Sequence, residues 1–488
     1  MEAHRSESLG NGVDGGTANP TGDSIMAEGS ADLEGVGADA NSLVTAEHGT
    51  LIPHEGEAEA NSISRTPATT HWLRALSWRG RTVLLIVCLA GYCESAVYSC
   101  LAPFFPLEAT KRGATDTQIA LIIGIFQLVV FLVSPVFGKY VTHFGAKFLF
   151  VCGLIVCGYS MCVFGILQYC PPGSSYVASA FAIRIVEAVG GAAYLTAAFA
   201  IIAREFPEQV STVFGLGEMM SGLGYLSGPL VGSLLYQLAG FKMPFLVLGA
   251  LEILCGFLAW YLLPSQTDIL SSEYAGTWKL LRMPRMIISL VSIFSALGAL
   301  GFLTATFADQ LDKQHLATYA IALIFILPSL AYIVSAPLAG YLSDKKNMGV
   351  SLMAVGSLII TGAFIVVGPS PFVASQPTVW TYSVGGGLLG VGVALGAIPC
   401  FDIGLKTAIG RGFSDDYHTY GLVSGVIGSA IALATFVGAA LGGLFVENYG
   451  FALATTGASG VSLVLAVIIV GFLLYERILA ARLSHTAN

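Results

Sequence analysis

Twelve apolar stretches of about 20 residues each most constrain what this chain can fold into. They begin near positions 82, 117, 148, 176, 211, 244, 286, 317, 350, 379, 420 and 452. A helix of about 20 apolar residues spans a hydrocarbon core of about 30 Å, and the alternating pattern of a membrane β-barrel is absent. Because lipid cannot satisfy open backbone polar groups, the sequence predicts an all-α membrane protein with twelve transmembrane helices.

The first part of the chain differs in composition from this apolar body. The 488 residues are 55% hydrophobic and 11% charged, whereas a soluble domain carries about 25% charge. Residues 1–70 contain twelve acids, two arginines and many small residues, a composition that buries too little apolar surface to fold. We expect residues 1–75 to form a disordered acidic cytosolic tail, with no cleaved signal peptide and no nucleic-acid partner.

The basic residues predict how the helices are oriented. Fifteen Lys and Arg residues lie at one set of helix ends and four at the other. Cytosolic loops collect positive charge, and the predicted number of helices is even. We therefore expect both termini in the cytosol.

Two segments repeat at nearly the same offset. "SPVFGKY" matches "APLAGYL" 202 residues later, and "GPLVGSLLYQLAGF" matches "GAALGGLFVENYGF" 210 residues later. Parallel repeats of six helices are typical of transporters that rock around a central site. The predicted parts after the tail are a six-helix half, a cytosolic linker, a second half and a cytosolic tail, over residues 76–264, 265–284, 285–478 and 479–488.

Both repeated loops resemble a known family pattern. The major facilitator superfamily carries Gly, three residues, Asp, a base, one residue and Gly after its second helix. "GKYVTHFGAK" has Thr142 in place of the Asp, whereas "GYLSDKK" keeps it. The retained positions are Gly138, Gly145, Lys147, Gly340, Asp344 and Lys345. This resemblance implies the major facilitator fold, with two six-helix halves in parallel pseudo-repeat.

The fifth stretch is similar to the antiporter signature of the same superfamily. That signature reads Gly, eight residues, Gly, three residues, Gly-Pro, two residues and Gly-Gly. It is matched by Gly215, Gly224, Gly228, Pro229 and Gly232, with Ser233 in place of the last Gly. Small residues four apart share a helix face and let a neighbouring backbone approach, and a proline bends the helix. We expect a tightly packed, kinked contact that seals one side of the protein, against the alternative of generic packing.

Overall likeness narrows the resemblance. "YSCLAPFFPLEATKRGA", "EFPEQVSTVFGLGEMMSGLGYLSGPLVG" and "FKMPFLVLGALE" look like the vesicular amine transporters, more so their polyamine branch than the monoamine or acetylcholine branches. The family exchanges luminal protons for cytosolic organic cations. Three charged positions of the monoamine branch are replaced here by Phe126, Ala394 and Gly428, which argues against monoamine or acetylcholine cargo through that network.

Charged residues inside apolar helices are the candidate site, because each costs about 2.5–3.5 kcal/mol unless paired or used. Glu94 shares a helix face with Tyr98, and a carboxylate beside an aromatic ring suits an ammonium group. The alternative is an acid satisfied by a neighbouring helix. Arg184 and Glu187 stand three residues apart and are expected to pair, either structurally or as a switch between access states.

Glu218 lies off the glycine face of its helix, about 120° from Gly224. Burial disfavours the charged form of a carboxyl group, so Glu218 is the candidate for taking up a luminal proton, with core polar packing as the alternative. Glu252 is a weaker candidate without a motif. Asp402 is expected to form an ordinary pair with Lys406 at the end of a helix.

His418 is expected at a solvated helix start, with pH sensing as the alternative. The nine cysteines show neither disulfide nor metal-ligand spacing, so we expect no metal and no cofactor.

The sequence therefore predicts a proton/organic-cation antiporter, not an enzyme, that is driven by a proton gradient and loads amines such as polyamines into an acidic vesicle. Its expected partners are the lipid bilayer, protons and a small organic cation, and it is expected to be a monomer. The alternatives are a proton-coupled drug or organic-cation efflux transporter of the plasma membrane, and a receptor or scaffold with this fold that does not transport.

Overall fold

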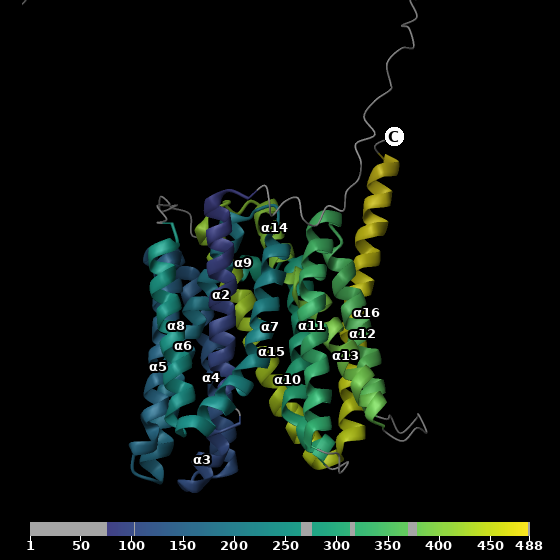
Figure 1. The fold of residues 1–488 in the computed structure, drawn as a ribbon. Coiled ribbons are helices and arrows are strands. Elements are labelled where there is room, and N and C mark those ends of the chain that lie inside the picture. Colours follow the sequence, from purple (N-terminus) through teal and green to yellow (C-terminus); the bar gives the residue numbers. More distant parts are fainter. Residues whose placement is uncertain (1–75, 102, 265–275, 313–317, 369–377, 487–488) are drawn as a thin grey trace, which may run out of the picture. The chain divides into compact units, whose positions relative to one another are not determined.

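The computed structural model describes residues 76–101, 103–264, 276–312, 318–368 and 378–486. The predicted acidic tail, residues 265–275 of the predicted linker and the last two residues of the predicted C-terminal tail lie outside the described residues. The described chain is almost entirely helical (Figure 1).

Long helices fill the first half. They are α2 (Trp78–Cys100), α4 (Asp116–Phe144), α5 (Ala146–Gly165), α6 (Ser174–Glu205), α7 (Val210–Ala239) and α8 (Lys242–Leu262). The short helix α3 (Phe105–Lys111) and the 3₁₀ turn η1 (Ile166–Tyr169) extend α2 and α5 at the end opposite the start of α2.

The second half repeats this pattern after the short helix α9 (Thr277–Leu281). Its helices are α10 (Pro284–Asp312), α11 (Thr318–Lys346), α12 (Gly349–Val367), α13 (Val379–Ala397), α14 (Pro399–Gly410), α15 (Tyr417–Tyr449) and α16 (Phe451–Thr486). Helices α13 and α14 form one continuous span that breaks before Pro399, so twelve spans are present in the described chain.

Eleven of these spans in the described residues are long and apolar enough to cross a membrane by length and composition. Helix α7 is the exception, although its 30 residues exceed the length that a crossing needs. Its glycines, its serines and Glu218 lower its hydropathy. One side of α7 packs on α2 and α11, while Leu230, Leu234 and Leu238 are exposed. The predicted fold class of twelve helices in two halves is confirmed.

Several helix ends follow from local chemistry. Thr115 and Gln118 form a capping box at the start of α4. Gly145, Gly240 and Gly450 end α4, α7 and α15 with φ of +86°, +77° and +80°, a conformation that favours glycine. Gly145 is thereby explained as the turn of the first loop motif, and Gly240 and Gly450 are equivalent in the internal repeat.

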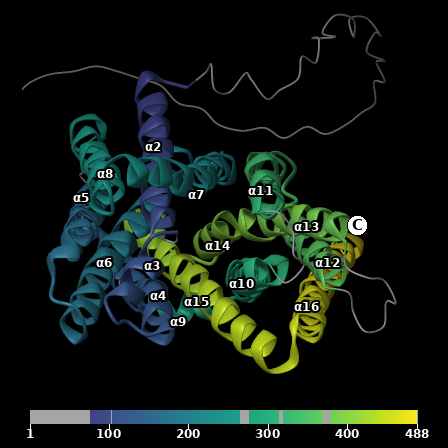
Figure 2. The same cartoon turned by 60° about the horizontal axis from the view of Figure 1, so that its bottom comes forward.

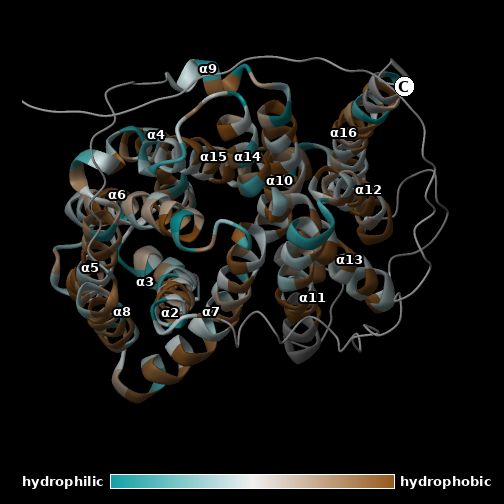
Figure 3. Ribbon diagram, turned by 90° about the horizontal axis from the view of Figure 1, so that it is seen from above, coloured by the Kyte–Doolittle hydropathy of each residue, from teal (hydrophilic) through white to brown (hydrophobic). Residues whose placement is uncertain are grey.

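The helix contacts repeat between the halves. Within the first half α2 packs on α7, and α5 on α6 and α8; within the second, α10 packs on α15, and α12 on α13 and α16. The halves meet where α4 contacts α15 and where α7 contacts α11. Figure 2 shows α15 passing between α4 and α10. In Figure 3 most helical ribbon is hydrophobic, and hydrophilic residues gather in the segments that join the helices.

Candidate functional site

Three helices of the first half bring four charged side chains together. Glu94 lies on α2, Arg184 and Glu187 on α6, and Glu218 on α7. Glu94 is within electrostatic reach of the other three. Arg184 and Glu187 are buried, whereas Glu94 and Glu218 are partly accessible. The structure thus places these four predicted residues in one cluster.

Arg184 and Glu187 form the expected ion pair. Arg184 Nη1 donates to Glu187 Oε1 at 2.6 Å, and the two residues are 0% and 2% exposed. Arg184 Nε and Glu187 Oε2 have no hydrogen-bond partner in the described structure. One buried donor and one buried acceptor therefore remain available beside the pair, which is costly unless something else binds there.

Aromatic rings surround the guanidinium of Arg184. Its Cζ lies 4.8 Å from the ring centre of Phe126 and 5.5 Å from that of Tyr98, within the range of cation–π contacts. The Tyr98 hydroxyl accepts a hydrogen bond from Gln127 Nε2 at 3.4 Å. Tyr98 thus contacts Arg184 of its own chain, a contact that sequence reasoning did not expect, and Phe126 stands where the monoamine branch has a lysine.

Glu218 is the member of the cluster that reaches the other half. Tyr332 on α11 donates its hydroxyl hydrogen to Glu218 Oε2 at 2.7 Å. Both side chains are partly accessible. Sequence reasoning missed Tyr332 because it searched the first half for membrane charges and for an aromatic residue on the same helix face as Glu94. Its hydroxyl, one turn after Pro328 inside an apolar helix, was the signal that could have found it.

Glu252 is a fully buried acid beside the cluster. It lies on α8 with 0% exposure, and neither carboxyl oxygen has a hydrogen-bond partner in the described structure. Glu94, Glu187 and Cys93 are within its electrostatic reach. One turn away, Gly249 packs against the Gly158 carbonyl of α5, so Glu252 lies next to a close contact between α8 and α5.

The glycine face of α7 lies against α2. A Cβ atom added at Gly224 would overlap the Tyr92 carbonyl oxygen, and one at Gly228 would overlap Ser99 Oγ and the Ala96 carbonyl oxygen. Gly232 faces Cys100 and Phe104 in the same way. The backbones therefore approach as closely as small residues allow. Ser233, which replaces the last glycine of the signature, donates to the Pro229 carbonyl oxygen at 2.7 Å.

Gly215, the first glycine of the signature, has a different neighbour. A Cβ atom there would lie 2.5 Å from the Ala336 carbonyl oxygen and 3.2 Å from Pro337 Cα, both on α11. Helix α7 therefore packs on its own half through Gly224, Gly228 and Gly232, and on the other half through Gly215. The equivalent helix of the repeat, α15, packs Gly438 against Gly298 of α10.

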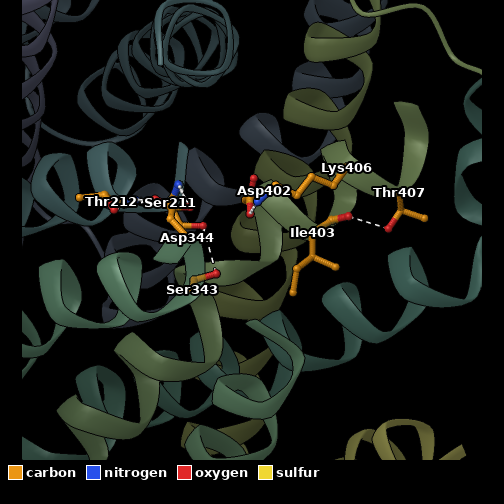
Figure 4. A network of polar contacts seen from close by, with 8 residues as sticks. All are labelled: Ser211, Thr212, Ser343, Asp344, Asp402, Ile403, Lys406 and Thr407. Carbon is orange, nitrogen blue, oxygen red and sulfur yellow. Dashed lines mark hydrogen bonds and ion pairs between the residues drawn. The ribbon is translucent and has the colours of Figure 1, made fainter. Parts of the chain in front are cut away.

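Asp344 of the second loop motif binds the start of α7 across the two halves (Figure 4). Its carboxylate accepts from Ser211 N at 3.1 Å and from Thr212 N and Oγ1 at 2.6 Å each. The backbone of Gly340 packs directly on Ser211. A carboxylate satisfies the open amides at a helix N-terminus and favours its dipole. Lys345, the next residue, donates to the Tyr341 hydroxyl at 2.6 Å and is exposed.

The first loop motif lacks this carboxylate, and the structure gives a reason. Its equivalent partner would be the start of α15, which Asp416 of the same segment already caps by accepting from Thr419 N at 3.0 Å. Gly138 still packs directly on Gly421 and Gly425 of α15. Lys147 donates to the Leu263 carbonyl oxygen at the end of α8. The degraded motif therefore keeps its helix contacts without an acid at Thr142.

Two residues given a minor role in the sequence lie near this end. Asp402 forms the expected pair with Lys406, with Nζ 2.7 Å from Oδ2, although Asp402 is only 3% exposed. His418 is 4% exposed. The expectation of a solvated helix start is therefore wrong for His418, because the first turn of α15 packs inside the bundle.

Comparisons with known proteins agree with this architecture. The profile described as Major Facilitator Superfamily matches residues 87–414. "MFS-type transporter SLC18B1" of Mus musculus is 38% identical over 399 residues, which is 80% of this chain and 86% of the relative. "Synaptic vesicular amine transporter" of Mus musculus is 25% identical over 355 residues, covering 72% of this chain and 65% of that protein.

A solved structure has the same fold. That of the human organic anion transporter MFSD10 (TETRAN) superposes with a TM-score of 0.61 at 16% identity, covering 80% of this chain and 99% of the other. The resemblance to the vesicular amine transporters is thus confirmed at the level of family. The chain is a multi-pass membrane protein and a secondary transporter of the vesicular amine type, and it belongs to the major facilitator superfamily.

Proposed function

We propose that the protein exchanges protons for an organic amine cation across the membrane of an acidic vesicle. The observation that carries this proposal is that Glu187, Glu218 and Arg184 all lie within electrostatic reach of Glu94. Three carboxylates and one guanidinium leave a net charge of −2 when all four are ionised. An environment of that charge attracts cations and would neutralise more than one amine, which supports a polyamine as cargo.

Each residue of the cluster has a role in this proposal. Glu94 binds an ammonium group of the cargo, since it is accessible and unpaired with Arg184 in the described contacts. The cargo also competes for Glu187, whose second oxygen is buried without a hydrogen-bond partner. Breaking the Arg184–Glu187 pair would then bias the protein toward one access state.

Glu218 couples the proton to the movement of the halves. Its bond with Tyr332 is charge-assisted while the carboxylate is ionised and weaker once it is protonated. A proton that enters from the lumen therefore loosens the contact between α7 and α11. Together with the release of Asp344 from the start of α7, this lets the basic end open to the cytosol, where the proton leaves and an amine enters.

The relatives support the vesicular location. Proteins named as synaptic vesicular amine and vesicular acetylcholine transporters match this chain, and the excess of basic residues at one end supports cytosolic termini. Loading of cargo against an acidic lumen follows from that arrangement. No cofactor takes part, and the proton gradient supplies the free energy.

The test is uptake of labelled spermidine and serotonin into proteoliposomes with an acidic interior. Native protein is expected to accumulate spermidine in proportion to the gradient, and Glu218→Gln to lose this accumulation. Glu208→Gln, the same change at an exposed residue, is the matched control and should transport normally. Failure of both amines to enter under any gradient would overturn the cargo class, and normal uptake by Glu218→Gln would overturn its proton role.

A further inference from the structure

A second site lies away from the charged cluster, at the basic end of the second half. A cavity of about 420 Å³ opens between the start of α10, the end of α14 and the outer part of α16. Figure 3 shows these three helices gathered at this end. The volume is in the range of pockets that bind small ligands.

The cavity is rich in positive charge. Arg285, Lys406 and Arg411 line it, together with one acid, Glu476. Arg285 Nε lies 2.6 Å from Glu476 Oε1, and Lys406 is paired with Asp402. In the described part of the chain no acid or hydrogen-bond acceptor engages the guanidinium of Arg411. The cavity thus presents an unneutralised cation beside two others, a set of donors that suits a phosphate group.

The other wall of the cavity is apolar and faces outward. Phe472, Tyr475 and Leu479 line it from α16, and Tyr475 and Leu479 are 61% and 44% exposed. An exposed tyrosine at the end of an apolar helix is typical of the membrane–water interface. The cavity therefore joins a positively charged floor to an apolar wall that faces outward.

We propose that this cavity binds the phosphate of an anionic phospholipid from the leaflet at the basic end, with its acyl chains along α16. The phosphate of a lipid headgroup and a free phosphate from solution are recognised by the same basic side chains, but only a lipid also uses the apolar wall. Basic residues near a membrane surface attract anionic lipids, and here they line a formed cavity. This site is independent of the proposed exchange of protons for amines.

The test is retention of phosphatidylglycerol, against phosphatidylcholine, by the purified full-length protein in native mass spectrometry. Arg411→Gln is expected to lower retention of phosphatidylglycerol about fivefold, the effect of one basic residue at a membrane surface. Arg282→Gln removes the same charge at the same end, outside the cavity lining, and is expected to keep native retention. Glu476→Gln releases Arg285 and should increase retention.

Three results would overturn the proposal. Native retention by Arg411→Gln would exclude the cavity. Loss of retention in Glu476→Gln would contradict the charge argument. If inorganic phosphate displaces phosphatidylglycerol and raises the melting temperature of the protein as much as phosphatidylglycerol does, the site belongs to a free anion. Scanning fluorimetry of each variant without lipid tests whether the variant is folded. Arg411→Gln is expected to fold, because the Arg411 side chain has no partner in the described structure to lose.

Discussion

At the scale of single residues, the membrane acids differ in what holds them. Glu187 has a buried partner in Arg184, Glu218 has a hydroxyl partner from the other half, and Glu252 has none in the described structure. A buried charge without a partner destabilises the folded protein, and removing one member of a buried pair leaves the other charge in that state. The three acids should therefore respond differently to the same substitution.

The pair of Arg184 and Glu187 is expected to behave as a unit. Arg184→Gln leaves Glu187 buried without its partner, which should destabilise the protein by about 3–5 kcal/mol. The double variant Arg184→Gln/Glu187→Gln removes both charges and should regain part of that loss. Apparent melting temperatures of the purified variants measure this coupling. A double variant no more stable than Arg184→Gln would mean that the pair is not the reason for the loss.

Glu252 is expected to tolerate loss of its acid. Neither oxygen makes a hydrogen bond in the described structure, so Glu252→Gln removes no bond, and an apolar side chain of similar length as in Glu252→Met should raise the melting temperature. Because Glu252 does not contact the other half, spermidine uptake by Glu252→Gln should stay within about twofold of native. Loss of uptake by a stably folded Glu252→Gln would instead assign Glu252 to the proton path.

At the scale of helices, glycine contacts fix the distances within each half. Gly228 lets α7 touch α2, and Gly438 lets α15 touch α10, so the internal repeat in the sequence corresponds to a repeated helix contact. Sequence spacing predicted which glycines share a face. The sequence could not predict that Gly215 belongs to a different contact, because which helix of the other half lies opposite depends on the docking of the halves.

Alanine substitution should destabilise the protein at glycines that touch a neighbouring helix, but not at glycines with open space beside them. Gly228→Ala and Gly438→Ala place a methyl group against a neighbouring backbone, so overpacking should destabilise the protein by about 1–3 kcal/mol. Both variants should therefore show a lower apparent melting temperature. Gly443→Ala adds the same methyl group in a helix where nothing lies within 4 Å, and its helix propensity favours alanine. Equal losses in all three variants would contradict a specific role for the repeated contact.

The start of α7 gives a second prediction at this scale. Asp344 accepts hydrogen bonds from the amides of Ser211 and Thr212 across the halves, whereas Asp416 caps α15 within its own segment. Asp344→Asn should therefore speed deuterium uptake in a peptide covering residues 207–214, far from the substitution in sequence. Asp416→Asn should speed uptake only around residues 417–420. No change at 207–214 in Asp344→Asn would mean that Asp344 does not hold the halves together.

At the scale of the whole molecule, apolar length, glycine spacing and the loop motifs sufficed to predict the fold, because each is a local pattern with a direct physical cause. The charged cluster was predicted as residues but not as a geometry. The contact of Arg184 with Phe126 and the bond of Tyr332 with Glu218 join segments far apart in sequence, and the burial of His418 depends on how the helices pack. Such partners depend on how the helices pack, and the periodicity of residues along one helix does not predict that packing.

The sidedness of the termini tests the number of crossings. Eleven helices in the described chain are apolar enough to span a membrane on composition alone, and α7 is the twelfth. Gly215 and Glu218 contact α11, and Gly224 and Gly228 contact α2, so its low hydropathy is compatible with a crossing packed against these two helices. Twelve crossings place both ends on one side, and the fifteen basic residues predict that this side is the cytosol.

Epitope tags at both ends make this measurable in cells. Antibodies should reach neither tag on closed vesicles with the cytosolic face inside, and both tags after permeabilisation. A tag in the loop between α3 and α4 should give the opposite result, which serves as the control for vesicle orientation. If only one terminal tag is reached in closed vesicles, the number of crossings is odd, and α7 is the helix that would have to lie outside the count.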